Sequence, residues 1–145
     1  MQFRASLSVA ASLFALANAR IYGIAFPETV KAGDNVTAIV ETENYIQTVQ
    51  DIAIAFGIAP EASAYPQTLG QNFLGSFYLG PEKSNIIENI TEIVTIPEDL
   101  APGKYVVAAG LYSLYGASKS TTLTNYNVTV TVGDATSETY VGSQL

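Results

Sequence analysis

The chain contains no cysteine, no histidine and no tryptophan. Without cysteine it has no disulfides, no thiol catalysis and no cysteine-ligated zinc or iron–sulfur site, so its core alone must hold the fold. Without histidine it lacks the commonest general base, the Ser-His-Asp triad and the usual metal ligand. Few side chains then titrate between about pH 5 and 8, so we expect a surface charge that hardly changes over that range.

Positive charge is also scarce, with six Lys and Arg against thirteen Asp and Glu and a net charge of −7. This balance argues against nucleic-acid binding and against binding to acidic membranes, because both require a basic face. The balance fits either a cationic partner surface or simple solubility.

The abundant carboxylates raise the question of catalysis. Glu41 and Glu43 share one strand face, and Glu88 and Glu92 share another. Hydrolysis of a glycosidic bond needs two carboxylates at a set separation across a cleft. A small domain with short loops and no tryptophan to stack on sugar rings offers little cleft. Exposed strand faces are the simpler interpretation, and we assign no catalytic residue.

Metal and cofactor sites find little support. Asp34, Asn35 and Asp51 are hard oxygen donors near predicted turns, as calcium prefers. No Asp-x-Asp-x-Asp loop accompanies them, and neither a phosphate-binding glycine loop nor a nucleophile elbow occurs. We expect no metal site and no cofactor.

The first nineteen residues predict a cleaved secretory signal. Arg4 supplies the positive charge, an apolar run follows, and Ala17-Asn18-Ala19 places small residues where signal peptidase reads them, so we predict cleavage before Arg20. The run spans roughly 20 Å as a helix, less than the ~30 Å hydrocarbon core of a bilayer. Residues 20–145 are therefore expected to form a single exported domain with no membrane insertion.

The dominant period of the remaining chain is two. Ile52, Ile54, Phe56 and Ile58 alternate with small residues, which is typical of a strand with one buried face. Further strands are expected at 21–26, 36–41, 74–79, 86–96, 104–114 and 126–132. About seven strands and no amphipathic helix predict an immunoglobulin-like antiparallel β-sandwich, with a small β-barrel as the alternative. Tyr105, just after a Pro-Gly turn, is a candidate for the corner tyrosine of such folds.

Three Asn-x-Thr sequons begin at Asn35, Asn89 and Asn127. The strand pattern predicts that the middle residue of each, Val or Ile, faces the core, so each asparagine and each threonine faces solvent. N-glycosylation at all three is therefore sterically allowed.

Aromatic residues supply the candidates for partner contact. Residues 110–116 end a predicted strand and enter a Ser- and Thr-rich loop, and they contain Tyr112, Leu114 and Tyr115. Such side chains can fill the core, or they can form a binding patch, since exposed tyrosines give large contact area at small entropy cost. The long irregular stretch at 59–72 is a second candidate surface.

Several longer segments resemble the necrosis-inducing secreted protein family of fungal effectors. They are 44–47, 51–57, 74–85, 109–116 and 124–136, and they occur in order from near the signal peptide to near the C-terminus. The resemblance implies secretion by a plant-associated fungus, with the host apoplast or the host cell as the site of action. It also implies induction of host cell death and suppression of pattern-triggered immunity, by binding and inhibiting host receptor-associated kinases.

Two further classes of function stay open beside an effector. A secreted domain that binds cell-wall or matrix polysaccharide fits the same composition. Catalysis is the least expected class, because the family's shared segments carry no catalytic motif and the chain lacks the usual catalytic side chains.

Overall fold

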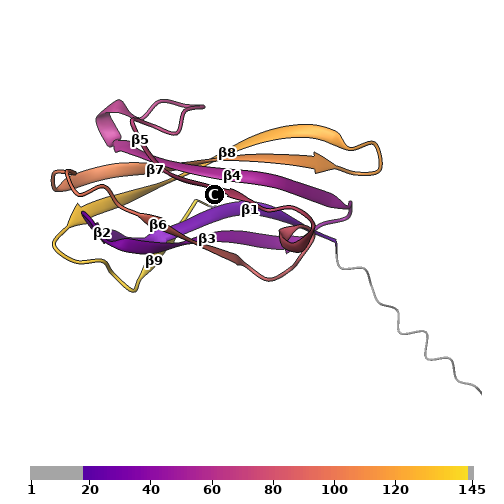
Figure 1. The fold of residues 1–145 in the computed structure, drawn as a ribbon, viewed down its shortest axis with the longest axis horizontal. Helices are drawn as coiled ribbons and strands as arrows, with labels where there is room; N and C mark the ends of the chain where they lie inside the picture. Colours follow the sequence, from indigo (N-terminus) through magenta and orange to yellow (C-terminus); the bar gives the residue numbers. More distant parts are fainter. Residues whose placement is uncertain (1–17, 144–145) are drawn as a thin grey trace, which may run out of the picture.

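The computed structural model describes residues 18–143, and these form nine strands in two packed sheets (Figure 1). Except for Asn18 and Ala19, the predicted signal segment lies outside the described residues. The strands are β1 (Ala19–Pro27), β2 (Thr29–Lys31), β3 (Asn35–Asn44), β4 (Val49–Pro60), β5 (Asn72–Tyr78), β6 (Ile90–Thr95), β7 (Gly103–Tyr115), β8 (Ser120–Gly133) and β9 (Tyr140–Gly142). The short 3₁₀ turns η1 (Glu61–Ser63) and η2 (Pro81–Lys83) interrupt the connections.

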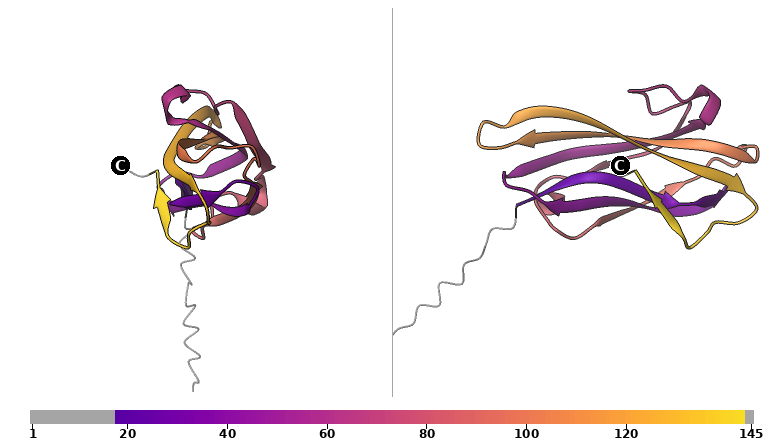
Figure 2. Two further views of the ribbon diagram at one scale, coloured as in Figure 1. Left: turned by 90° about the vertical axis from the view of Figure 1, so that its left-hand side faces the viewer. Right: turned by 180° about the vertical axis from the view of Figure 1, so that it is seen from behind.

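One sheet has the strand order β6-β3-β1-β9 and the other the order β2-β8-β7-β4-β5. Figure 2 shows them from behind as two layers, with the long β7–β8 hairpin running the length of the upper one. The two sheets are separate, so the chain is an all-β sandwich rather than a single closed barrel.

The core lies between the layers and is built by strand alternation. Ile54, Phe56 and Ile58 of β4 are fully buried, as the sequence pattern predicts. The ring of Phe56 packs edge-on against Phe26 of β1 at 5.6 Å between centroids, which joins the two sheets. This apolar interface holds the fold without a disulfide.

The seven predicted strands are confirmed, and two short strands were not predicted. β9 pairs with the end of β1, and β2 pairs in parallel with the end of β8, so the sheets are not wholly antiparallel. A three-residue strand is too short to show a periodic pattern, because its existence depends on the neighbour that it joins.

Two tyrosine hydroxyls tie strands to the rest of the fold. Tyr105 donates a 2.8 Å hydrogen bond to the carbonyl of Ala101, four residues upstream, which is the contact of a tyrosine corner. Tyr126 of β8 donates to the carbonyl of Ile21 in β1 at 3.0 Å and so bridges the sheets. Burial raises the pKa of Tyr126 well above its ordinary value, so this donor keeps its proton.

The start of β1 is part of the sheet. Ala19 is fully buried, and its N–H donates to Oδ1 of Asn85 at 3.1 Å. The carbonyl of Asn18 accepts a 2.8 Å bond from the N–H of Tyr45. Within residues 18–143 no helix has the length and apolar character to cross a membrane.

Candidate partner-binding surface

The predicted contact residues Tyr112, Leu114 and Tyr115 all lie within β7, because the strand predicted at 104–114 extends to Tyr115 before the turn begins. β7 continues to Tyr115, and the turn to β8 occupies only residues 116–119. Alternation along β7 places Tyr112 and Leu114 on the outer face of the five-stranded sheet. Tyr115 lies on the opposite side, in line with the buried residues. The structure thus brings two of the three candidates together and separates the third.

Tyr115 packs against neighbouring side chains at one end of the sandwich. Its ring packs edge-on against Tyr45 at 5.7 Å between centroids, and the Arg20 guanidinium lies 4.7 Å from the Tyr45 ring centroid. Arg20 also donates from Nε to Glu43 at 2.7 Å. Burial, followed by the nearby Asp51 carboxylate, raises the pKa of the Tyr115 hydroxyl. Tyr115 is therefore committed to internal contacts.

On the outer face of the five-stranded sheet, four side chains from different strands lie side by side. The sequence alone did not predict that they are neighbours. Cross-strand pairing sets Leu123 beside Tyr112, Tyr112 beside Ala53, and Ala53 beside Tyr78. We call these four residues, which come from β8, β7, β4 and β5, the outer row. Leu123 is 79% exposed and Tyr78 is 72% exposed, values that are high for large apolar side chains. The outer row is thus an apolar stripe across four adjacent strands.

Next to the outer row, the 61–71 loop lies directly on the sheet. A Cβ added at Gly57 of β4 would stand 2.0 Å from the carbonyl oxygen of Leu69, and one added at Gly70 would stand 2.7 Å from Cβ of Ala59. Only glycines permit this approach of loop to strand. The irregular stretch predicted as a second candidate surface is therefore docked on the same face as the outer row.

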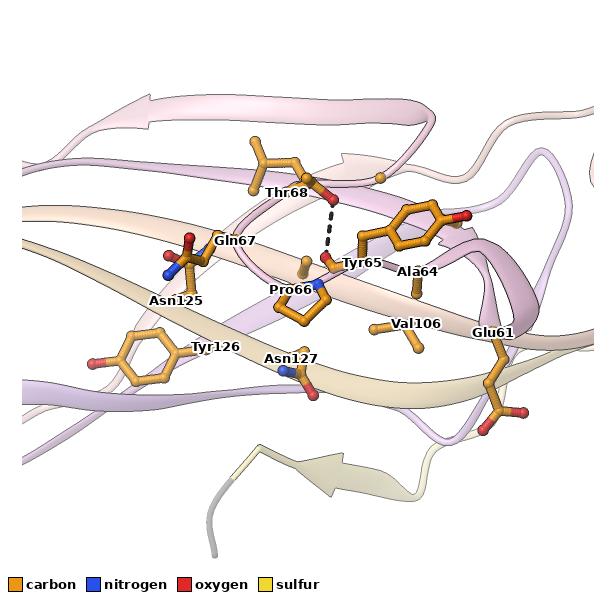
Figure 3. Close-up of a pocket in the computed structure, with 14 residues that line it drawn as sticks. Glu61, Ala64, Tyr65, Pro66, Gln67, Thr68, Val106, Asn125, Tyr126 and Asn127 are labelled. Atoms are coloured by element: carbon orange, nitrogen blue, oxygen red, sulfur yellow. Dashed lines mark hydrogen bonds between the residues drawn. The ribbon is translucent and has the colours of Figure 1, made fainter.

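A pocket of about 230 Å³ opens where this loop meets the sheet (Figure 3). Tyr65 and Gln67 contribute from the loop, and Asn125 and Asn127 contribute from β8. Thr68 donates a 3.0 Å hydrogen bond to the carbonyl of Tyr65, which holds the tip of the loop. Apolar residues, including Pro66, Leu69 and Val106, make up much of the lining, together with amide side chains, the exposed Tyr65 and one carboxylate, Glu61.

The outer face is nearly free of charge. Along its four long strands, β8, β7, β4 and β5, Lys104 at the start of β7 is the only charged side chain on this face among the described residues. Most charged residues lie elsewhere, on the four-stranded sheet and in the turns. A partner that covers the outer row consequently loses little charge hydration.

In each of the two carboxylate pairs that raised the question of catalysis, one member forms an ion pair. Glu43 forms an ion pair with Arg20 at 2.6 Å. Glu92 points inward from β6, with its side chain 11% exposed, and forms an ion pair with Lys83. One member of each pair is therefore already neutralised by a cation.

Each of the three candidate calcium donors accepts a hydrogen bond from a different side chain. Oδ2 of Asp34 accepts from Thr136 at 2.8 Å, and Oδ1 of Asn35 accepts from Thr95 at 2.7 Å. Asp51 is buried in β4 and accepts from Ser113 at 2.6 Å. Over residues 18–143, no three acidic, histidine or cysteine side chains gather as a metal site.

All three sequon asparagines have exposed side chains, while Val36, Ile90 and Val128 are buried at 3%, 5% and 5% exposure. Asn35 and Asn89 each accept one hydrogen bond through Oδ1, from Thr95 and from the N–H of Thr42. A glycan is attached through Nδ2, so these bonds are compatible with modification. Glycosylation itself stays a prediction.

Comparison with known proteins places the chain in a family. The sequence model of the Nis1 family matches residues 17–131. The chain is 81% identical over 144 residues to necrosis-inducing secreted protein 1 of Colletotrichum higginsianum, covering 99% of each chain. It is 70% identical over 145 residues to the protein of the same name from Colletotrichum orbiculare, covering 100% of this chain and 89% of the relative.

Among solved structures, a superoxide reductase (neelaredoxin) from Ignicoccus hospitalis is similar in outline. The TM-score is 0.47 at 15% sequence identity, with 80% of each chain covered. At that level the likeness carries no chemistry to this chain.

Proposed function

Because the chain belongs to the Nis1 family, we propose that it is a secreted effector that induces plant cell death and suppresses pattern-triggered immunity by binding and inhibiting host receptor-associated kinases. Its relatives are named as secreted, necrosis-inducing proteins of Colletotrichum, and secretion agrees with the N-terminal signal pattern. We infer that the sandwich is immunoglobulin-like, because the Tyr105 hydroxyl makes the backbone hydrogen bond of a tyrosine corner. Action by binding, rather than by turnover, fits the paired carboxylates and the absence of histidine and cysteine.

The outer row is the observation that supports a binding role. Exposed tyrosine side chains form the centres of many protein interfaces, because each buries a large area with few rotatable bonds. Here Tyr112 stands on the central strand β7, while Leu123 and Tyr78 stand on β8 and β5 of the same hydrogen-bonded sheet, so little backbone ordering is needed on binding. We therefore place the kinase contact on the outer row.

Capture of host kinase domains tests this placement. The mature protein is compared with a Tyr112→Ala/Leu123→Ala variant and with an Ile93→Ala variant as the matched control. Ile93 is 68% exposed but lies on the outer face of the other sheet. We expect the double variant to lose capture and kinase inhibition at least tenfold and Ile93→Ala to retain both. Equal capture by all three proteins would remove the outer row from the proposal.

Activity in the plant tests the effector role itself. Leaf tissue expressing the chain with and without residues 1–19 is scored for cell death and for the immune burst. Cell death and a reduced burst are expected from the secreted form. A secreted, folded protein that changes neither response would overturn the proposal.

Polysaccharide binding is the second candidate, and the pocket beside the 61–71 loop favours it. Gln67 and Asn125 present amide groups to a pocket that the exposed side chain of Tyr65 also lines, a combination that suits hydroxyl-rich ligands. Retention of the mature domain on insoluble glucan or chitin, lost on Tyr65→Ala, would support this function. Elution with the unbound fraction would exclude it for those polymers.

A further inference from the structure

The outer edge of β8 is the longest unpaired strand edge within residues 18–143. β8 pairs with β7 along its length, but β2 covers its other side only at Thr131, Val132 and Gly133. We call residues 120–130 the open edge of β8. Its backbone N–H and C=O groups on that side have no partner strand, and such an edge templates pairing with another chain.

The composition of the open edge favours unwanted pairing. Residues 120–130 contain no charge, no proline and no glycine, and they are rich in β-branched threonine and valine. This is the pattern of segments that associate strand to strand. Neither a lysine nor a bulge interrupts the pairing of β8 with β7, which stays in register throughout.

The other edges of the two sheets carry protective features. β2 and β9 are only three residues long. β6 holds the inward-pointing Glu92, and the pairing of β5 with β4 shifts register near Gly75. Short length, inward charge and irregular register are the devices that natural sheets use against edge association. β1, which β9 covers only at residues 25–27, shifts register against β3 between Ile21 and Gly23. Among the strand edges of residues 18–143, only the open edge of β8 lacks such a feature.

Asn127 lies in the middle part of this edge. The N–H of Thr131 donates to the carbonyl of Glu28, on the side away from β7. Because backbone groups alternate along a regular strand, the N–H groups of Thr129 and Asn127 point to that same side. The Asn127 side chain is exposed, and Asn127-Val128-Thr129 is a sequon.

We propose that an N-linked glycan on Asn127 guards the open edge of β8 against strand pairing with a second copy of this chain. An added strand must approach to about 4.8 Å. A large hydrated glycan standing on the edge strand itself blocks that approach along several residues. The glycan thus takes the place of the short length, inward charge or irregular register that protects the other edge strands.

The test uses the full chain secreted from a eukaryotic host. Asn127→Gln and Thr129→Ala both destroy the sequon, whereas Thr129→Ser keeps it and serves as the matched control. Asn35→Gln removes a sequon at the start of β3 and controls for general loss of glycan. We expect a glycopeptide at Asn127, and we expect the first two variants to shift from monomer to dimer or larger species in light scattering. The two controls should stay monomeric.

A rescue variant separates edge pairing from misfolding. Adding Asn125→Lys to Asn127→Gln places a charge on the open edge and should restore the monomer. Circular dichroism must show the same β content and unfolding transition for each variant. The proposal is overturned if Asn127 carries no glycan, if the aglycosyl variants stay monomeric, or if the lysine fails to rescue.

Discussion

Ser113 donates a 2.6 Å hydrogen bond from Oγ to Oδ1 of Asp51, and both side chains are buried between the central strands β7 and β4. The backbone N–H of Asp51 donates a second hydrogen bond, to Oγ of Ser84 at 2.8 Å. Burial raises the pKa of the Asp51 carboxyl above its ordinary value of 3.8, and the bond from Ser113 partly offsets that rise. The sandwich therefore contains one acid whose charge opposes folding.

Asp51 should make stability fall as pH rises. Between the ordinary pKa and the raised folded pKa, the native state binds more protons than the unfolded state, so unfolding becomes easier with increasing pH. Asp51→Asn removes this titration and keeps an oxygen that accepts from Ser113. Urea denaturation from pH 3 to pH 7 should show the parent losing stability relative to Asp51→Asn across that window. Parallel curves would contradict the raised pKa.

Ser113→Ala should destabilise the fold by about 1–3 kcal/mol, because it leaves a buried carboxylate with one donor fewer. The same change in an Asp51→Asn background should cost less, because a neutral amide tolerates the loss better. A double-mutant cycle in urea measures the difference. Equal losses in the two backgrounds would mean that the two side chains are not coupled.

Gly57→Ala should detach the 61–71 loop from the sheet. The new methyl group would meet the carbonyl oxygen of Leu69 at 2.0 Å, and overpacking of this kind costs about 1–3 kcal/mol. Thermolysin, which cleaves before large apolar residues, should then cleave before Leu69 in the loop faster than in the parent. Gly110→Ala is the matched control, because its methyl group would meet only Cδ2 of Leu69 at 3.7 Å. The same cleavage rate in both variants would show that the loop is not held by this approach.

Strand positions were predictable here because most strands keep one apolar face, as Ile54, Phe56 and Ile58 do in β4. Strand neighbours were not predictable, because pairing depends on the whole fold. The partners of Tyr112 are Ala53, nearly sixty residues earlier, and Leu123 across the next turn. The outer row therefore appears only with the sheet order. The local sequence offered no reason to distinguish Tyr112, Leu114 and Tyr115 as contact residues. In the structure β7 is unbroken, and its alternation places Tyr115 on the opposite face from Tyr112 and Leu114.

The buried contacts of Asn18 and Ala19 bear on where the mature chain begins. Cleavage before Arg20 would remove the Ala19 N–H bond to Asn85, the Asn18 carbonyl bond from Tyr45 and a fully buried methyl group. Two hydrogen bonds of about 1 kcal/mol each and a buried carbon of about 0.8 kcal/mol suggest a loss of about 2–3 kcal/mol. A chain that begins at Arg20 should therefore be less stable in urea than one that begins at Asn18.

The same contacts predict which terminus the secreted protein carries. Ala15 and Ala17 offer signal peptidase a second pair of small residues, with cleavage directly before Asn18. The signal pattern alone predicts cleavage before Arg20, but of these two termini only Asn18 keeps the first pair of β1 with β3, Ala19 with Asn44. We therefore revise that prediction and expect N-terminal sequencing of the secreted protein to begin at Asn18. Asn85→Ala in the chain that begins at Asn18 is the control, because it removes the side-chain bonds and leaves the strand in place. Secreted protein that begins at Arg20, with stability equal to the longer chain, would show that these two residues contribute nothing to the folded domain.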